Sequence, residues 1–240
     1  MNFYIMTLFP ELVMGGLMGS IMKRGMDKGR IDIEAVNIRD YTTCKHGKVD
    51  DYPFGGGAGM LLQAQPVYDC YKAILKKIPD HDKKPPKVLY MSPQGKTFHQ
   101  QMARELSEEE DLILLCGHYE GIDQRVLDKI GVTEVSIGDY VLTGGELAAM
   151  VMVDTIARRV PGVLNNDSST EEESFSNGLL EYPQYTRPEI WEGEAVPEVL
   201  LSGHHKKIET YRINAALENT KNKRPDLYEA YLRAERVKKI

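Results

Sequence analysis

The chain has 240 residues, of which 42% are hydrophobic and 28% charged, and its formal net charge is -6. These values are typical of a globular protein that forms one large domain or two small ones. The longest apolar run, Leu147–Val153, is far too short to cross a bilayer, which excludes a membrane-spanning protein, and we expect no membrane partner.

The first two-thirds of the chain alternate between predicted strands and predicted helices. Strands are predicted at Phe3–Leu8, Ile31–Asn37, Val88–Met91, Leu112–Cys116 and Thr133–Ile137, and helices at Glu11–Met26, Pro66–Ile78, Phe98–Leu106, Ile122–Ile130 and Glu146–Arg159. Such alternation predicts an α/β fold, with a mostly parallel sheet and helices on both faces.

The pattern changes at Pro161. The stretch PGVLNNDSSTEEESFSNGL is polar and acidic and rich in turn residues, which is typical of a linker. After it, Ile208–Leu217 and Asp226–Val237 read as helices of a small domain. We therefore predict a first domain over residues 1–160, a linker over 161–178 and a basic helical domain over 179–240.

Charge is unevenly distributed along the chain. From Ser202 to Ile240 there are ten Lys and Arg against five Asp and Glu, which gives +5 and leaves -11 for residues 1–201. A basic end on an acidic body favours a polyanionic partner. A solvated, lysine-rich helical face is the alternative interpretation.

Several familiar motifs are incomplete. Gly95-Lys96-Thr97 ends like a P-loop, but Tyr90 stands where the opening glycine belongs, and Met60 replaces the last glycine of G-x-G-x-x-G. The six histidines show no H-E-x-x-H spacing, so no metal site is predicted. The three cysteines form no C-x-x-C pair, and NFYIMTLFPE has no basic signal-peptide region; together these favour a reducing cytoplasm.

Three glycine-bearing loops remain, each directly after a predicted strand. They are Tyr90–Gly95, Cys116–Gly121 and the loop that opens SIGDYVLTGGELAAM. Ligands of open α/β sheets gather beyond the carboxyl ends of the strands, and glycine leaves backbone polar groups accessible. Because no phosphate cradle is present, the loops suit an adenosine-like ligand, unless the glycines only make tight turns.

Motifs over the whole chain resemble one family. CGHYEGID, SIGDYVLTGGELAAM, PGVL, YPQYTRP, VLLSGHH and DDYPFGGGAGM are similar to those of the bacterial tRNA (guanine-N1-)-methyltransferases, which belong to the trefoil-knotted SPOUT superfamily. The resemblance implies a deep trefoil knot at the C-terminal end of the α/β domain, followed by a small all-helical domain. It also implies a homodimer with its active site at the subunit interface.

The resemblance implies that S-adenosylmethionine lies bent among the three loops. The implied cofactor-binding residues are Tyr90, Met91, Ser92, Pro93, Gln94, Gly117, Tyr119, Glu120, Gly121, Ile137, Gly138, Tyr140, Leu142, Gly144 and Gly145. Some positions depart from the family pattern; His118, for example, stands where an arginine can occur.

The chemistry of the resemblance needs a base and a cation. Methylation of guanine N1 removes a proton from that nitrogen while negative charge builds on O6. Glu173 falls where the family has its aspartate base, although Glu172 or Asp167 could take the proton, and Glu173 also fits a capping box. Arg158 falls at the family's arginine and would polarise O6, or it could simply complement a helix C-terminus. Mg²⁺ is a further charge stabiliser, with no ligands assigned.

The implied partner is tRNA, methylated at guanine 37, just 3′ of the anticodon. The candidate RNA contacts are Arg39, Asp50, Tyr185, Arg187, His205 and Lys206. Two alternatives stay open: a knotted ribose 2′-O-methyltransferase, and a relative that binds RNA without catalysis.

Overall fold

The computed structural model describes residues 1–165 and 173–237. The chain divides into two compact units, Met1–Asn166 and Asp167–Ile240. No helix of the described part is long and apolar enough to pass through a bilayer.

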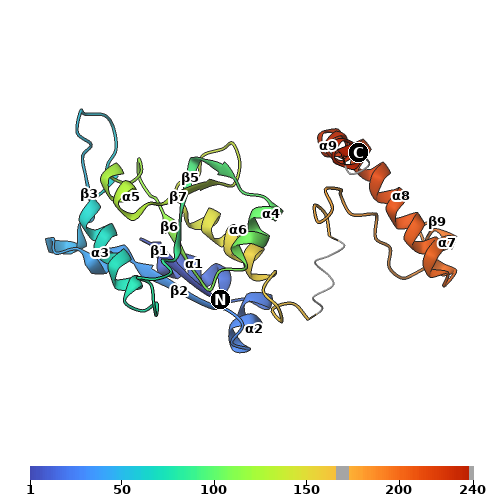
Figure 1. Ribbon diagram of the computed structural model, residues 1–240, viewed down its shortest axis with the longest axis horizontal. Helices are drawn as coiled ribbons and strands as arrows, with labels where there is room; N and C mark the ends of the chain where they lie inside the picture. Colours follow the sequence, from blue (N-terminus) through green and yellow to red (C-terminus); the bar gives the residue numbers. More distant parts are fainter. Residues whose placement is uncertain (166–172, 238–240) are drawn as a thin grey trace. The chain divides into compact units, whose positions relative to one another are not determined.

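The first unit is built on a five-stranded sheet with the order β2-β1-β6-β5-β7 (Figure 1). The strands are β1 (Asn2–Thr7), β2 (Asp32–Asn37), β5 (Lys87–Thr97), β6 (Asp111–Cys116) and β7 (Thr133–Ser136). Every neighbouring pair in this sheet is parallel, which confirms the predicted α/β class. The carboxyl ends of β5, β6 and β7 therefore meet at one edge.

Helices cover both faces of this sheet. One face carries α1 (Pro10–Leu17), α2 (Ser20–Asp27), α4 (Gln100–Leu106) and α6 (Glu146–Ala157), and the other carries α3 (Ala64–Leu75) and α5 (Gln124–Ile130). Strand β6 shows why two cores form. Leu112 and Leu114 pack into the first core and Ile113 and Leu115 into the second, because successive side chains of a strand point to opposite faces.

The predicted helix Glu11–Met26 is wrong in one respect, because the structure contains two helices there. Helix α1 ends at Leu17, and Gly19, with extended backbone, is the N-cap that precedes α2. Ser20 follows with a φ of 47°. Glycine in a helix interior costs about 1 kcal/mol relative to alanine, so three glycines within five residues permit the break.

The predicted strand Val88–Met91 is only the first part of β5. The pairing with β7 shifts register between Met91 and Lys96 and then resumes, so the first predicted loop is a bulge held at both ends. Gly95 makes the return possible, because a Cβ there would collide with the backbone of Glu134.

Short elements frame the polar loop between β2 and α3. The 3-10 turns η1 (Ile38–Tyr41) and η2 (Lys45–Gly47) lead into β3 (Asp50–Asp51), which pairs antiparallel with β4 (Leu61–Leu62). Leu62 in turn forms a bridge with Ile122, just after the second predicted loop. The polar loop is thereby attached to the edge of the sheet where the glycine-bearing loops gather.

The second unit is mainly helical, with α7 (Glu198–Leu201), α8 (His205–Lys223) and α9 (Pro225–Val237). Helix α8 is longer at both ends than the predicted Ile208–Leu217. The expectation of an all-helical domain misses a short antiparallel hairpin of β8 (Ile190–Trp191) and β9 (Glu194–Ala195). Buried Thr220 on α8 accepts a hydrogen bond from the Leu180 backbone nitrogen at 2.8 Å, which anchors the irregular segment before the hairpin.

The burial of the cysteines gives a simple test of the first unit. Cys70 and Cys116 are buried and Cys44 is exposed; burial raises the pKa of Cys70 to about 12 and raises that of Cys116 well above its usual value. The thiolate is the reactive form. We therefore expect Ellman's reagent at pH 8 to modify Cys44 rapidly in the native chain and all three thiols in denaturant. Rapid reaction of Cys70 or Cys116 in the native chain would contradict this packing.

Candidate functional site

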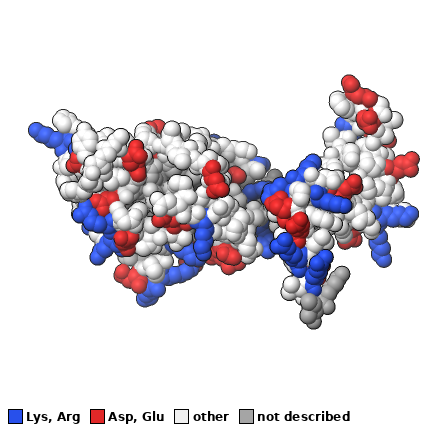
Figure 2. Space-filling model, turned by 90° about the horizontal axis from the view of Figure 1, so that it is seen from above, with Lys and Arg blue, Asp and Glu red and all other residues white. Residues whose placement is uncertain are grey.

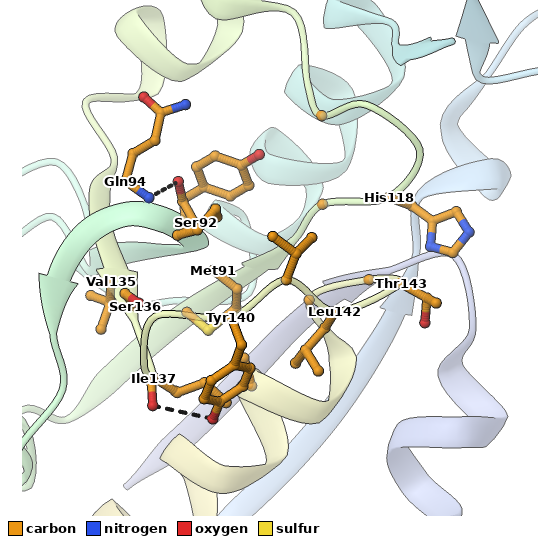
Figure 3. Close-up of a pocket in the computed structure, with 18 of the residues that line it drawn as sticks. Met91, Ser92, Gln94, His118, Val135, Ser136, Ile137, Tyr140, Leu142 and Thr143 are labelled. Carbon is orange, nitrogen blue, oxygen red and sulfur yellow. Dashed lines mark hydrogen bonds between the residues drawn. The ribbon is translucent and has the colours of Figure 1, made fainter. Parts of the chain in front are cut away.

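A cleft of about 270 Å³ opens beyond the carboxyl ends of β5, β6 and β7. Its walls are residues 90–94, 117–121, 135–138 and 140–145, and Ala148 of α6 also lines it (Figure 3). Every residue predicted to bind the cofactor is among them. The loops are brought together because β6, β5 and β7 are adjacent and parallel, so three segments far apart in the sequence end at one place.

Glycine lets the second and third loops touch through their backbones. The Gly145 nitrogen donates a hydrogen bond to the Gly117 oxygen at 2.9 Å. A Cβ on Gly145 would lie 2.8 Å from Cys116 Cα, closer than real Cβ atoms approach, and 3.0 Å from Met91 Cβ, which is a tight contact. A Cβ on Gly117 would lie 3.0 Å from the Tyr90 ring. A side chain at position 145 would therefore require the surrounding backbone to move, and one at position 117 would require the Tyr90 ring to give way.

The third loop gives the cleft apolar walls. Ile137, Tyr140 and Leu142 are drawn around it in Figure 3, and the Tyr140 hydroxyl donates to the Ile137 oxygen at 3.3 Å. The Tyr140 ring packs against Gly138, whose φ of 147° suits glycine. Apolar walls combined with open backbone polar groups fit a nucleoside better than a highly charged phosphate chain.

The first loop is fixed by a buried serine. Ser92 Oγ donates to Glu134 Oε2 at 2.5 Å and accepts from the Gln94 nitrogen at 3.2 Å. Nearby, burial and then the Glu134 charge raise the pKa of Tyr90, so its phenol is neutral at physiological pH. The loop thus presents neutral hydrogen-bonding groups to the cleft.

The second loop carries an unusual backbone conformation. Tyr119 has a φ of 59°, a region that residues other than glycine adopt at an energetic cost. Its ring packs on His118 with centroids 4.8 Å apart, and its hydroxyl accepts from Arg39 Nη2 at 3.4 Å. Arg39, which we predicted as an RNA contact, therefore lies at the rim of the cleft.

Sequence reasoning did not foresee that polar groups are buried together beneath the loops. Glu146, at the start of α6, is only 3% exposed and accepts a hydrogen bond from Thr7 Oγ1 at 2.8 Å. Its position after two glycines is that of an ordinary acid at a helix N-terminus, so no sequence pattern indicates its burial. His118 Nδ1 is also buried and has no hydrogen-bond partner in the described part of the chain.

The two predicted catalytic residues lie on different units. Arg158 caps the C-terminus of α6, roughly 20 Å along the helix from Gly145 at a rise of about 1.5 Å per residue. Glu173 is half-buried in a turn of the second unit, where its backbone carbonyl oxygen accepts a hydrogen bond from the Ser176 backbone nitrogen at 3.1 Å. Residues 173–189 contain no helix, and Ser169 and Thr170, the caps of the alternative capping boxes, lie outside the described residues. Asp167 and Glu172 lie outside the described residues.

The remaining predicted RNA contacts differ in exposure. Asp50 is buried, with only 8% of its surface exposed, and could contact an RNA only after a local movement. His205 and Lys206, in contrast, are exposed in the first turn of α8. Tyr185 and Arg187 line a cavity of about 610 Å³ in the second unit. In the face that Figure 2 shows, basic and acidic side chains are interspersed on both units, so no continuous basic surface forms there.

Metal ligation finds no support in this part of the chain. Among residues 1–165 and 173–237, no group of three or more His, Cys, Asp or Glu side chains could hold an ion. The sequence assigned no ligands to Mg²⁺, and the described residues offer none.

Comparison with known proteins agrees with the geometry. The sequence model of the family described as tRNA (Guanine-1)-methyltransferase TrmD matches residues 1–230. The chain is 59% identical to the tRNA (guanine-N(1)-)-methyltransferase of Lachnospira eligens over 233 residues, which cover 97% of each chain. It is 57% identical to that of Clostridioides difficile over 95% of this chain and 97% of the relative. Its identity with that of Clostridium botulinum is 52% over 100% and 97%.

Proposed function

The chain belongs to the tRNA (guanine-1)-methyltransferase family, and from this premise we propose that it methylates N1 of guanine 37 in tRNA, with S-adenosylmethionine as the methyl donor. The observation that carries the proposal is the cleft in which every cofactor-binding residue implied by the family pattern converges. The cytoplasm, where tRNA is modified, is the compartment we expect for it.

The residues of the cleft fit the donor. Backbone N–H and C=O groups around Gly117 and Gly145 suit the hydrogen-bonding edge of adenine and the ribose, and Ile137 and Leu142 suit its apolar face. When bound, S-adenosylmethionine supplies an electrophilic methyl group. The protein must then hold the guanine in line with that methyl and exclude water.

The guanine needs a base and a positive charge. We assign to Glu173 the removal of the N1 proton, which frees the nitrogen lone pair for attack. We assign to Arg158 a hydrogen bond to O6, where negative charge builds as the proton leaves. No residue is assigned to Mg²⁺, and no step depends on it.

We propose that two copies of the chain complete the site. A guanidinium at the end of α6 cannot reach a ligand in the cleft at the start of the same helix, roughly 20 Å away. A second copy can supply it. Four large apolar side chains are about half exposed: Leu12 in α1, Met18 at the C-terminal end of α1, and Leu147 and Val151 in α6. Such an exposed apolar face suits a symmetric interface.

The knot implied by the family also stays a proposal. Its support is the backbone pairing of the third loop with the second. His118 and Gly144 form an isolated β-bridge, and the Gly145 nitrogen donates a hydrogen bond to the Gly117 oxygen. The segment between β7 and α6 is thus held against the loop that follows β6.

One assay tests the proposed function. Purified protein is incubated with a tRNA transcript that carries guanine at position 37 and with labelled S-adenosylmethionine, and the product is mapped by nuclease digestion. We expect 1-methylguanosine at position 37, and no product when that guanine is replaced. Methylated ribose would instead establish the 2′-O-methyltransferase alternative. Binding of tRNA without any product would establish the non-catalytic one.

Lys206 offers a test of the RNA-binding surface. It is exposed at the start of α8, so we expect Lys206→Ala to weaken tRNA binding about threefold to tenfold and to lower the salt dependence by about one ion. Filter binding at several salt concentrations measures both. Lys84→Ala is the matched control, because Lys84 is exposed just before β5, at the opposite edge of the sheet from the cleft. Equal effects of the two changes would remove Lys206 from the interface.

A further inference from the structure

Two buried polar groups beneath the cleft have no part in the reaction assigned above. Glu146 lies at the start of α6, and one of its oxygens, Oε1, accepts the hydrogen bond from Thr7. His118 lies on the second cleft loop, and its Nδ1 is buried without a hydrogen-bond partner among the described residues. A buried polar atom of this kind calls for an explanation, since such atoms are nearly always hydrogen-bonded.

Gly144 brings the two groups to the same place. A Cβ on this glycine would lie 2.8 Å from His118 Nδ1 and would also touch Glu146 Oε2. Both atoms therefore crowd the same side of the Gly144 Cα, where no side chain fits. A small rotation of the imidazole ring joins its Nδ1–H to the nearby carboxylate, and a water molecule that touches both groups would join them as well.

We propose that Glu146 is a positioning residue, which accepts a hydrogen bond from His118 Nδ1–H, directly or through one water, and thereby fixes the second wall of the cofactor cleft. The inference rests on the proposed function and adds a residue to it. A neutral imidazole that donates from Nδ1 presents Nε2 as an acceptor, so the same bond also sets the tautomer of the ring.

The contacts of His118 show how the effect reaches the cleft. Its ring packs edge-on against Phe9, with centroids 5.1 Å apart, and against Tyr119 at 4.8 Å. Tyr119 holds a costly backbone conformation and bonds Arg39 at the rim. A fixed His118 ring supports that conformation. Thr7 on β1 and the N-terminus of α6 hold the carboxylate in turn, so the support comes from the rigid sheet.

A matched pair of variants isolates the polar atom. His118→Asn keeps an amide nitrogen close to the position of Nδ1, whereas His118→Leu has similar bulk and no polar atom, and both lose the ring contacts with Phe9 and Tyr119. We expect His118→Leu to weaken S-adenosylmethionine binding by about tenfold, measured by titration calorimetry on the full-length protein. We expect His118→Asn to bind at least about fivefold more tightly than His118→Leu. Equal affinities of the two variants would overturn the proposal.

Two further measurements separate positioning from other roles. In a Glu146→Ala background, His118→Asn and His118→Leu should bind S-adenosylmethionine with equal affinity. A remaining difference in affinity would overturn the pairing of His118 with Glu146. If the Glu146→Ala protein does not fold, the comparison of the two single variants still decides. At saturating S-adenosylmethionine, the single-turnover methyl-transfer rates of the two His118 variants should agree within about threefold, because only binding is affected. Widely different rates would contradict a positioning role. A wild-type chain that binds no S-adenosylmethionine would overturn the proposed function itself.

Discussion

Glu173→Gln is expected to bind S-adenosylmethionine as tightly as the wild-type chain and to methylate tRNA at least about a hundredfold more slowly, the scale of a lost general base. Glutamine has nearly the shape of glutamate but cannot accept the N1 proton. Glu173 belongs to the second unit, whereas the cleft is lined by residues of the first, so its loss should leave cofactor binding intact. Calorimetry and single-turnover methylation measure the two effects separately.

The neighbouring acid provides the control for this result. Glu172→Gln should leave the rate within about threefold of the wild type, because the proton transfer is assigned to Glu173. Glu173→Asp restores the residue type that the family resemblance places here, and we expect it to stay within about tenfold of the wild-type rate. A near wild-type rate in Glu173→Gln, with a slow Glu172→Gln or Asp167→Asn, would move the proton transfer to one of those acids.

The parallel sheet could be predicted from the sequence because strands and helices alternate with clear boundaries. Two errors came from glycine. The break at Gly19 and the return of β5 at Gly95 depend on what each glycine allows in three dimensions, and periodicity does not report that. The length of α8 was underestimated because its polar ends, such as Lys206 and Lys221, carry no apolar pattern and extend the helix by packing and propensity.

The position of the cleft could be predicted from the sequence, because the ends of parallel strands meet at one edge and because the motifs resemble a known family. The polar group beneath the cleft could not be predicted. Thr7, His118 and Glu146 come from three separate elements, and nothing in their local sequence indicates that they meet. Each is unremarkable alone: a strand end, a loop residue and a helix acid. Burial turns them into a connected group, and burial depends on how β1, β6 and α6 pack.

Gly145→Ala is expected to weaken cofactor binding by on the order of a hundredfold, or about 2.7 kcal/mol. The added Cβ would lie 2.8 Å from Cys116 Cα, 3.0 Å from Met91 Cβ and 3.1 Å from the Gly117 nitrogen. Two of these are backbone atoms of the strand and loop that form the cleft floor. They cannot move aside as a flexible side chain would, and overpacking of a rigid site costs about 1–3 kcal/mol.

Gly15→Ala distinguishes loss of the cleft from a general effect of changing glycine. Gly15 lies in α1, with nothing within 4 Å of its added Cβ, so alanine there should leave binding unchanged and raise stability by about 0.5–1 kcal/mol. Calorimetry with S-adenosylmethionine and thermal unfolding of both variants give the comparison. S-adenosylmethionine must fit the spacing between the second and third loops, which the Gly145–Gly117 hydrogen bond sets.

If the Gly145→Ala protein folds and binds S-adenosylmethionine normally, the ligand does not lie between these loops, and the cleft must serve another purpose.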